Sequence, residues 1–375
     1  MNSFCLYHTL QFFLQYDPLK SRVDTSVHNY FKKNKALGSK DRKIIAEFIY
    51  KYVRFRTLIE HVLHIRSIQS QEDVFNILRF EPEDWIESKE IPTHVKYGFK
   101  KDFLDYLSKS FNSVNLEQFL KTNLENAPTY GRVNPLKISR DDLLQRLSTR
   151  YIAEPTKRSC YGIKFNKRIN FSSDPDYKNG LFEIQDESSQ LAALELNPQP
   201  CEKILDFCAG GGGKSLLIGA LMQNRGQLFL HDVRADALVE AKKRLKRAGV
   251  QNFQILSSDF SRDKFYKFFD RVFLDVPCSG TGTLRRNPDM IGRLNIADLK
   301  NLVELQRKIF DETFPLLKKG GYILWATCSV LKEENEEQID YFLEKYKLQK
   351  AKPALKIMPE TNSSDGFFAQ LLQVC

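Results

Sequence analysis

Residues 203–215 read KILDFCAGGGGKS, in which an apolar run and four consecutive glycines precede the amphipathic stretch SLLIGALMQ. An apolar run that passes through a glycine turn into a helical pattern is typical of a strand–turn–helix unit. Glycines at such a turn let the backbone bend tightly and let a ligand approach the N-terminus of the helix. The stretch therefore predicts a ligand-binding loop at the end of a parallel strand.

The sequence that follows this loop alternates between strand-like and helical patterns. Short apolar runs occupy 227–232, 253–259, 271–277 and 322–330. Helical periodicity occupies 215–223, 234–249 and 296–319. Such alternation predicts a parallel, doubly wound sheet. Because NPQP at 197–200 marks a boundary, we expect a Rossmann-like α/β domain over 200–375.

Two different patterns precede this domain. Over residues 1–125 apolar positions recur at helical spacing, as in KIIAEFIYKYVRFRTLIEHVL, which predicts an all-α domain. Between Phe31 and Arg66 ten Lys or Arg residues face three acids, which favours an RNA-facing surface, although a solvated helix face has the same pattern. Over 126–199 short β-rich runs are broken by Pro, Gly, Asn and Asp, which predicts a small α+β module.

Composition excludes several classes of protein. The 375 residues carry a net charge of +10, which favours a polyanionic partner but also suits a basic surface that binds nothing. The sequence has no apolar run of membrane-spanning length, and its first 20 residues do not resemble a signal peptide. Seven scattered cysteines form neither a disulfide framework nor a zinc pattern. We expect no membrane, no metal, and reduced thiols in the cytoplasm.

Residues near the glycine loop indicate which class of ligand it binds. A phosphate loop of the form G-x-x-x-x-G-K-[ST] would need glycine where Cys208 stands, so a P-loop ATPase is the weaker alternative. Asp232 ends the next strand, where a carboxylate accepts hydrogen bonds from ribose hydroxyls. Asp259 follows the third strand and is a candidate for the adenine side, with a turn or capping role as the alternative. These features favour a nucleoside ligand.

A second motif, DVPCSGTGTLRRNPDM, covers residues 275–290 at the end of the fourth strand. Asp275 and Cys278 stand at the edge of an open α/β sheet where ligands bind, and glycines in the following loop permit close approach of a flat substrate. Arg285 and Arg286 are candidates for RNA phosphate contacts, or are two solvated arginines. The motif predicts a substrate site at this edge.

A third motif, WATCSVLKEENEEQI, covers residues 325–339. It places Cys328 at the end of the fifth strand, before a helix N-terminus that favours a reactive thiolate. One such cysteine is most simply a packing residue. Two cysteines at the carboxyl edges of strands in one sheet, Cys278 and Cys328, are difficult to explain as core residues.

These three motifs resemble those of the RsmB/Sun family of RNA cytosine-5 methyltransferases. Three further matches stand in the family's order, RVNPLK at 132–137, FEIQDESSQ at 182–190 and DGFFAQLLQ at 365–373. The basic stretch at 36–63 resembles the NusB-like RNA-binding domain of bacterial members. Two departures are Gly211, where many members have proline, and a shorter, diverged N-terminal region.

The resemblance implies a function and a set of site residues. It implies S-adenosylmethionine as cofactor, small-subunit (16S) rRNA as substrate and no required oligomer. Cys328 would be the nucleophile that adds to cytosine C6, Cys278 would assist product release and Asp275 would assist at the base. The implied cofactor contacts are Cys208, Ala209, Gly210, Gly211, Gly212, Gly213, Lys214, Asp232, Asp259 and Asp275. The alternative is a non-catalytic RNA-binding or antitermination factor on a methyltransferase scaffold.

Overall fold

The computed structural model describes residues 1–18 and 20–375. The chain divides into two compact units, one of residues 1–126 with 283–299 and the other of residues 127–282 with 300–375. Each unit has its own hydrophobic core, as their separate clusters of buried residues show.

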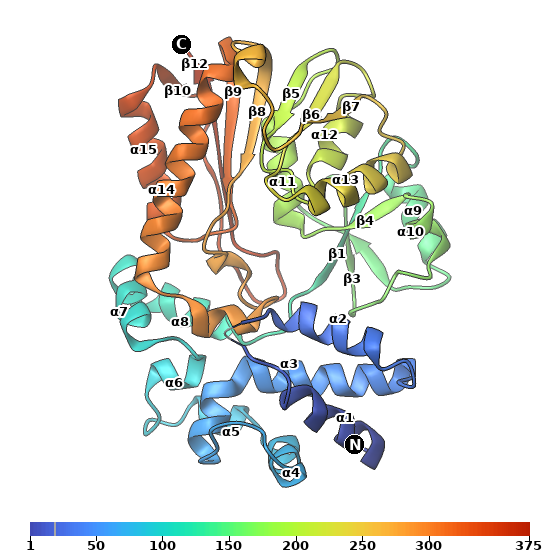
Figure 1. Cartoon of the computed structure of the whole chain (residues 1–375), viewed down its shortest axis with the longest axis vertical. Helices are drawn as coiled ribbons and strands as arrows, with labels where there is room; N and C mark the ends of the chain where they lie inside the picture. Colours follow the sequence, from blue (N-terminus) through green and yellow to red (C-terminus); the bar gives the residue numbers. More distant parts are fainter. Residues whose placement is uncertain (19) are drawn as a thin grey trace. The chain divides into compact units, whose positions relative to one another are not determined.

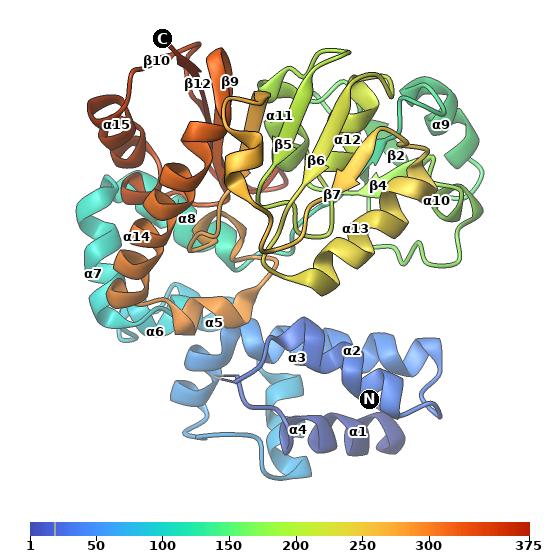
Figure 2. The same cartoon turned by 45° about the horizontal axis from the view of Figure 1, so that its top comes forward.

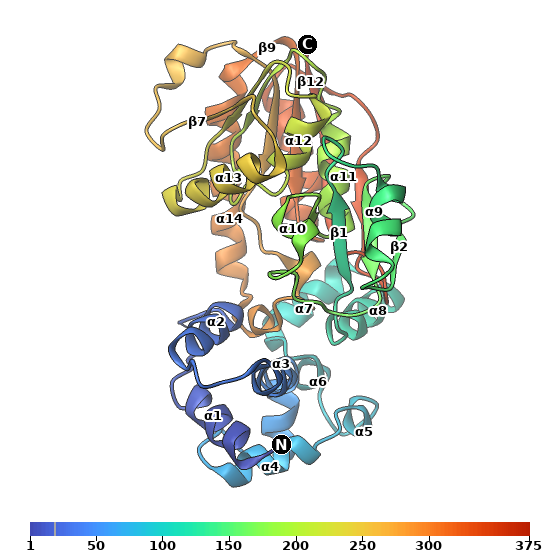
Figure 3. The same ribbon diagram turned by 90° about the vertical axis from the view of Figure 1, so that its right-hand side faces the viewer.

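The first unit is helical (Figure 3). Its helices between residues 1 and 126 are α1 (Ser3–Phe13), α2 (Val23–Lys33), α3 (Ser39–Val62), α4 (Gln71–Arg79), α5 (Glu83–Ile86), α6 (Thr93–Tyr97), α7 (Lys101–Ser110) and α8 (Ser113–Asn123). The longest, α3, buries Ile45, Ile49 and Tyr52, which are three or four residues apart and so share one face. Asp41 caps its start by accepting a hydrogen bond of 3.2 Å from the Gly38 N–H.

Residues 283–299 pack with these helices rather than with the sheet that precedes them in sequence. The Asp289 carboxylate accepts a hydrogen bond of 3.3 Å from the Val23 N–H at the start of α2. Arg293 donates through Nε to the Pro18 carbonyl at 2.6 Å. This arrangement differs from our expectation, which assigned the whole of 200–375 to one domain. These long-range polar contacts leave no local pattern in the sequence.

The second unit begins with a small antiparallel sheet. Its strands are β1 (Thr129–Val133), β2 (Ala153–Pro155), β3 (Gly162–Phe165) and β4 (Phe182–Ile184), in the order β2-β3-β1-β4. Helices α9 (Arg140–Leu147) and α10 (Pro175–Lys178) lie beside it (Figure 3). Leu143 and Leu147 of α9 pack with Val133 and Ile163 in a small core.

The larger sheet has eight strands (Figure 1). They are β5 (Lys203–Asp206), β6 (Gln227–Leu230), β7 (Phe253–Ile255), β8 (Phe269–Asp275), β9 (Leu317–Thr327), β10 (Leu348–Lys350), β11 (Leu355–Ile357) and β12 (Phe367–Val374). The order is β10-β12-β9-β8-β5-β6-β7, and β11 pairs with β12. The five strands from β9 to β7 are parallel, whereas β12 runs antiparallel to β9.

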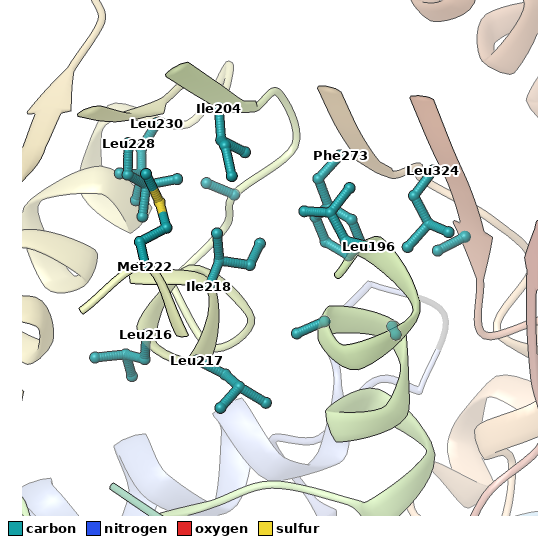
Figure 4. Packing of buried hydrophobic residues seen from close by; sticks show 14 of the residues in the cluster. Leu196, Ile204, Leu216, Leu217, Ile218, Met222, Leu228, Leu230, Phe273 and Leu324 are labelled. Carbon is teal, nitrogen blue, oxygen red and sulfur yellow. The ribbon is translucent and has the colours of Figure 1, made fainter. Parts of the chain in front are cut away.

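Helices cover both faces of this sheet (Figure 2). They are α11 (Glu187–Leu196), α12 (Ser215–Leu221), α13 (Ala235–Ala248), α14 (Ile296–Thr313) and α15 (Glu336–Lys345). Successive strand residues point to opposite faces, so Ile204 packs with α11 to α13 (Figure 4), while Leu205 packs with Phe310 of α14 and Phe342 of α15. The expected doubly wound α/β architecture is confirmed.

One expected helix ends earlier than predicted, and its last residues belong to a strand. The helix expected over 296–319 ends at Thr313, and residues 317–319 begin β9. Pro315 cannot continue a helix. Leu317 instead pairs with Phe269 of β8. The apolar and basic residues after Pro315 kept a helical spacing by coincidence.

Candidate active site

The expected site residues come together because of strand polarity. Parallel strands β5, β6, β8 and β9 all end at one edge of the sheet, and their C-terminal loops carry the glycine motif, Asp232, Asp275 and Cys328. The chain order reverses between β5 and β8, since β6 and β7 extend the sheet on one side and β9 on the other. A crevice at such a switch point is the usual ligand site of open α/β sheets.

The glycine loop has the conformation that its sequence predicts. Gly210 and Gly212 have positive φ angles of 52° and 75°, which L-residues with a side chain rarely adopt. A Cβ atom at Gly212 would lie 3.0 Å from the Cβ of Ala241, so glycine also permits close packing on α13. Gly211 is not among the residues with positive φ, so its own φ does not require glycine.

Two arginines fix this loop from outside, and motif reasoning missed both roles. Arg244 of α13 donates to the Gly211 carbonyl at 2.7 Å. Arg132 of β1 donates to the Gly213 carbonyl at 2.6 Å and to the Gln185 side chain. Arg132 is only 3% exposed. An arginine within the RVNPLK motif, at position 132, was the available signal in the sequence.

Asp232 is attached to the loop by its own carboxylate. Its Oδ2 accepts a hydrogen bond of 2.8 Å from the Gly210 N–H, and its Oδ1 accepts one of 2.9 Å from the Arg234 N–H. Burial alone would raise the pKa of Asp232, but the hydrogen bonds from Arg234 and Gly210 outweigh it and lower the pKa. Asp232 is therefore an anion beside the glycine loop. Asp259 lies farther along, in an exposed turn beyond β7.

Asp275 and Lys214 form an ion pair at this edge of the sheet. The Lys214 Nζ lies 2.6 Å from Asp275 Oδ2, and their side chains are 16% and 29% exposed. Burial lowers the pKa of Lys214, but the attraction and hydrogen bond of Asp275 outweigh it, so the net shift is upward. The pair connects the glycine loop after β5 with the motif after β8.

The two thiols lie side by side. The Sγ atoms of Cys278 and Cys328 are 3.3 Å apart, and both residues are partly buried. The pKa of the Cys278 thiol is raised well above its ordinary value, first by its hydrogen bond with Cys328 and then by burial. Cys278 thus carries a proton that the neighbouring sulfur can accept. Strand-end placement predicted two thiols at one edge, and the structure brings them into contact.

Backbone contacts between three loops hold the thiols in this position. The Gly282 N–H donates to the Cys328 carbonyl at 2.9 Å, and the Gly366 N–H donates to the Gly282 carbonyl at 2.8 Å. The Asp365 N–H donates to Asp186 Oδ1 at 3.2 Å. The DGFFAQLLQ and FEIQDESSQ motifs therefore converge on the cysteine loops, for which their sequences gave no physical reason.

Asp206 is a further buried group that sequence reasoning missed. It ends β5 and accepts a hydrogen bond of 2.5 Å from Ser215 Oγ, while its Oδ1 is buried without a protein partner. Burial raises the pKa of Asp206 to about 7. The charged residue inside the apolar run KILDF was the available signal. An unpaired buried oxygen beside the glycine loop suits a group that a ligand would satisfy.

One expected RNA contact, Arg285, is placed elsewhere, and the lysine of the RVNPLK motif contacts backbone carbonyls. Arg285 belongs to the helical unit and is 1% exposed, so its side chain is not at the surface that a phosphate would reach. Lys137 donates to the carbonyls of Asn179 and Arg247 at 2.7 and 2.6 Å, which neutralises the C-terminal end of α13.

Residues 1–18 and 20–375 show neither a metal-binding cluster nor a membrane-spanning helix. No group of His, Cys, Asp or Glu side chains there has the arrangement of a metal site. No helix there combines the length and apolarity that crossing a membrane requires.

Comparison with protein families gives two matches. Residues 193–373 match the 16S rRNA methyltransferase RsmB/F family, and residues 103–172 match the ferredoxin-like domain of RsmF/B-like methyltransferases.

Individual relatives agree with these matches. The ribosomal RNA small subunit methyltransferase B of Proteus mirabilis is 30% identical over 85% of this chain and 73% of its own length. The 28S rRNA (cytosine-C(5))-methyltransferase of Mus musculus is 33% identical over 75% of this chain, which spans only 39% of that protein. The crystal structure of PH0851 shares the fold over 99% of both chains, with a TM-score of 0.80 and 22% identity.

The fold and the crevice define the class first. A doubly wound sheet with a glycine loop after one parallel strand and a carboxylate after the next suits a nucleoside ligand, and the family match places it in the class of S-adenosylmethionine-dependent methyltransferases. Within that class, the chain belongs to the RsmB/F family of RNA methyltransferases. Family membership overturns the P-loop ATPase alternative.

Proposed function

We propose that this protein transfers a methyl group from S-adenosylmethionine to C5 of a cytosine in RNA, with 16S rRNA of the small subunit as substrate. The observation that carries the proposal is the 3.3 Å contact of Cys278 and Cys328 at the sheet edge that also holds the glycine loop. The family's 16S rRNA description and the small-subunit name of the Proteus mirabilis relative support the substrate.

The residues of the crevice fit the cofactor. The turn from Cys208 to Lys214 offers backbone groups at a helix start, and Asp232 is an anion suited to ribose hydroxyls. Asp275 lies between this turn and the thiols, and Asp259 would serve the adenine side. Bound S-adenosylmethionine would supply an electrophilic methyl group.

The two thiols divide the chemistry. In the proposed mechanism the Cys328 thiolate uses an electron pair to form a bond to C6 of cytosine. The electrons displaced from the C5–C6 double bond then make C5 nucleophilic towards the methyl group. With the base bound, Asp275 would have to carry a proton, which it would donate in a hydrogen bond to N3 of the base and so favour this addition. The C5 proton must then leave, and its electron pair expels the Cys328 thiolate from C6.

Cys278 suits the release step because of what raises its pKa. The largest cause is the hydrogen bond with Cys328. Once Cys328 is a neutral thioether, that cause disappears and Cys278 loses its proton more readily. Its thiolate could then remove the C5 proton. The same pair thus provides a nucleophile first and a base second. Both thiols must stay reduced, so we propose a cytoplasmic site of action.

The remaining parts are proposed to bind RNA. We propose a NusB-like RNA-binding domain over 1–125, a small α+β RNA-binding module over 126–199 and the methyltransferase domain over 200–375, of which residues 283–299 pack with the helical unit. The basic residues between Phe31 and Arg66 support the first. We also propose that no oligomer is required.

The test is transfer of labelled methyl from S-adenosylmethionine to 16S rRNA that lacks its natural modifications, followed by mapping of the modified base. We expect a single 5-methylcytosine, lost in Cys328→Ala and kept in Cys160→Ala, which changes an exposed cysteine outside the crevice. RNA binding without any methyl transfer would instead favour the non-catalytic RNA-binding factor.

A further inference from the structure

Glu334 is a buried carboxylate of the third motif, and the proposed chemistry gives it no role. It lies in the turn that follows Cys328 and is 0% exposed. Its Oε1 accepts hydrogen bonds from the Ser279 N–H at 2.8 Å and Gln306 Nε2 at 2.9 Å, and its Oε2 accepts one from Ser279 Oγ at 2.5 Å. These donors are all neutral. A buried carboxylate held by neutral donors costs folding free energy, so a role in function is the simplest reason for its presence.

The contacts of Glu334 converge on the backbone around Cys278. Ser279 follows Cys278 directly, and Gln306 of α14 donates also to the Pro277 carbonyl at 2.9 Å. Glu334 and Gln306 therefore hold the residues on both sides of this cysteine. The carbonyl of Glu334 in turn accepts a hydrogen bond of 3.0 Å from Trp325 Nε1 in β9.

A hydrogen-bond network of hydroxyl groups connects these residues with the second cysteine. Ser279 and Ser329 each follow one of the two cysteines, and their Oγ atoms are 3.2 Å apart. Thr281 Oγ1 lies 3.1 Å from Ser329 Oγ and accepts a hydrogen bond of 3.1 Å from the Val330 N–H. The separation of the two sulfurs is thus reproduced one residue later by two hydroxyls that Glu334 anchors.

We propose that Glu334 is a positioning residue that holds Cys278 against Cys328 and favours the proton-bearing form of Cys278 while Cys328 attacks. The assignment of stages rests on the proposed function, whereas the effect on Cys278 does not. The negative charge of Glu334 contributes to the raised pKa of Cys278, after the larger contributions of Cys328 and burial. Cys328 and Glu334 both raise the pKa of Cys278, and Lys214 interacts electrostatically with Cys328.

The first experiment measures Cys278 without any RNA. In a Cys328→Ala background, the rate of Cys278 alkylation by iodoacetamide is followed against pH by mass spectrometry, with and without Glu334→Gln. The amide keeps the shape and most hydrogen bonds but removes the charge, so we expect the alkylation midpoint to fall by about one pH unit. Glu337→Gln, which changes an exposed carboxylate in α15, should leave the midpoint unchanged.

The second experiment measures catalysis in the full-length protein. We expect Glu334→Ala to lower kcat for methyl transfer by about tenfold or more with little change in the KM for RNA, and Glu334→Gln to recover part of that loss. Ser279→Ala removes the hydroxyl that donates to Glu334, and it provides the same test if Glu334→Ala does not fold.

The outcomes are distinct. An alkylation midpoint in Glu334→Gln equal to that of its parent overturns the proposal, whatever the activity. A shifted midpoint in a protein that methylates no RNA supports the action of Glu334 on Cys278 and rejects the proposed function instead.

Discussion

The Sγ atoms of Cys278 and Cys328 lie 3.3 Å apart, although 50 positions separate the two residues. Neighbouring parallel strands β8 and β9 bring their loops to one edge, and the hydrogen bond from Gly282 to the Cys328 carbonyl sets the distance between them. A contact this short permits proton exchange between sulfurs.

The two cysteines should give opposite phenotypes. We expect Cys328→Ala to abolish methylation and every covalent RNA adduct, because no sulfur remains to attack C6. Cys278→Ala should accumulate a methylated adduct, because the base that frees the product is missing. Denaturing gels with labelled methyl distinguish the two, and the reverse pattern would show that the roles are exchanged.

Close approach of two glycines should be essential to this site. A Cβ atom at position 282 would fall 2.7 Å from the carbonyl carbon of Gly366. We expect Gly282→Ala to destabilise the fold by about 1–3 kcal/mol and to lower methyl transfer, because the loops must move apart. Gly292→Ala is the matched control, since a Cβ there meets nothing within 4 Å. Equal melting temperatures for the two variants in thermal unfolding would contradict this expectation.

Arg132 should affect the cofactor more than the RNA. Replacement by methionine removes its hydrogen bond to the Gly213 carbonyl and loosens the glycine loop. Loss of a charge-assisted hydrogen bond corresponds to about tenfold in affinity. We expect the Kd for S-adenosylmethionine, measured by calorimetry, to rise by that factor in Arg132→Met. The exposed Arg158→Met is the control, and equal losses in both would reject this role.

Asp206 should give the free protein a pH-dependent stability. Its folded-state pKa is raised from 3.8 to about 7, so between these values the folded state holds a proton that the unfolded state has released. Stability contributed by this group therefore falls as pH rises towards about 7. We expect Asp206→Asn to flatten the dependence of the melting temperature between pH 5 and pH 8, with its largest gain at the higher pH. An unchanged slope would contradict the assignment.

Patterns in the sequence predicted the elements that depend on local chemistry. The run KILDF followed by four glycines predicted a strand, a turn and a helix, and the structure has β5, a loop with positive φ at Gly210 and Gly212, and α12. The predictions failed at residues whose structure depends on partners far away in the sequence. Residues 317–319 join β9 through pairing with β8, and Arg285 is buried in the helical unit.

The sequence by itself determined which residues stand at strand ends, because side-chain polarity and glycine placement act within a few residues along the chain. It also carried the family resemblance that names a thiol as nucleophile. Only the tertiary structure decided that Cys278 contacts Cys328, that Arg132 supports the glycine loop and that Glu334 anchors both cysteine loops. Those contacts join segments far apart in sequence, and strand order together with packing selects them.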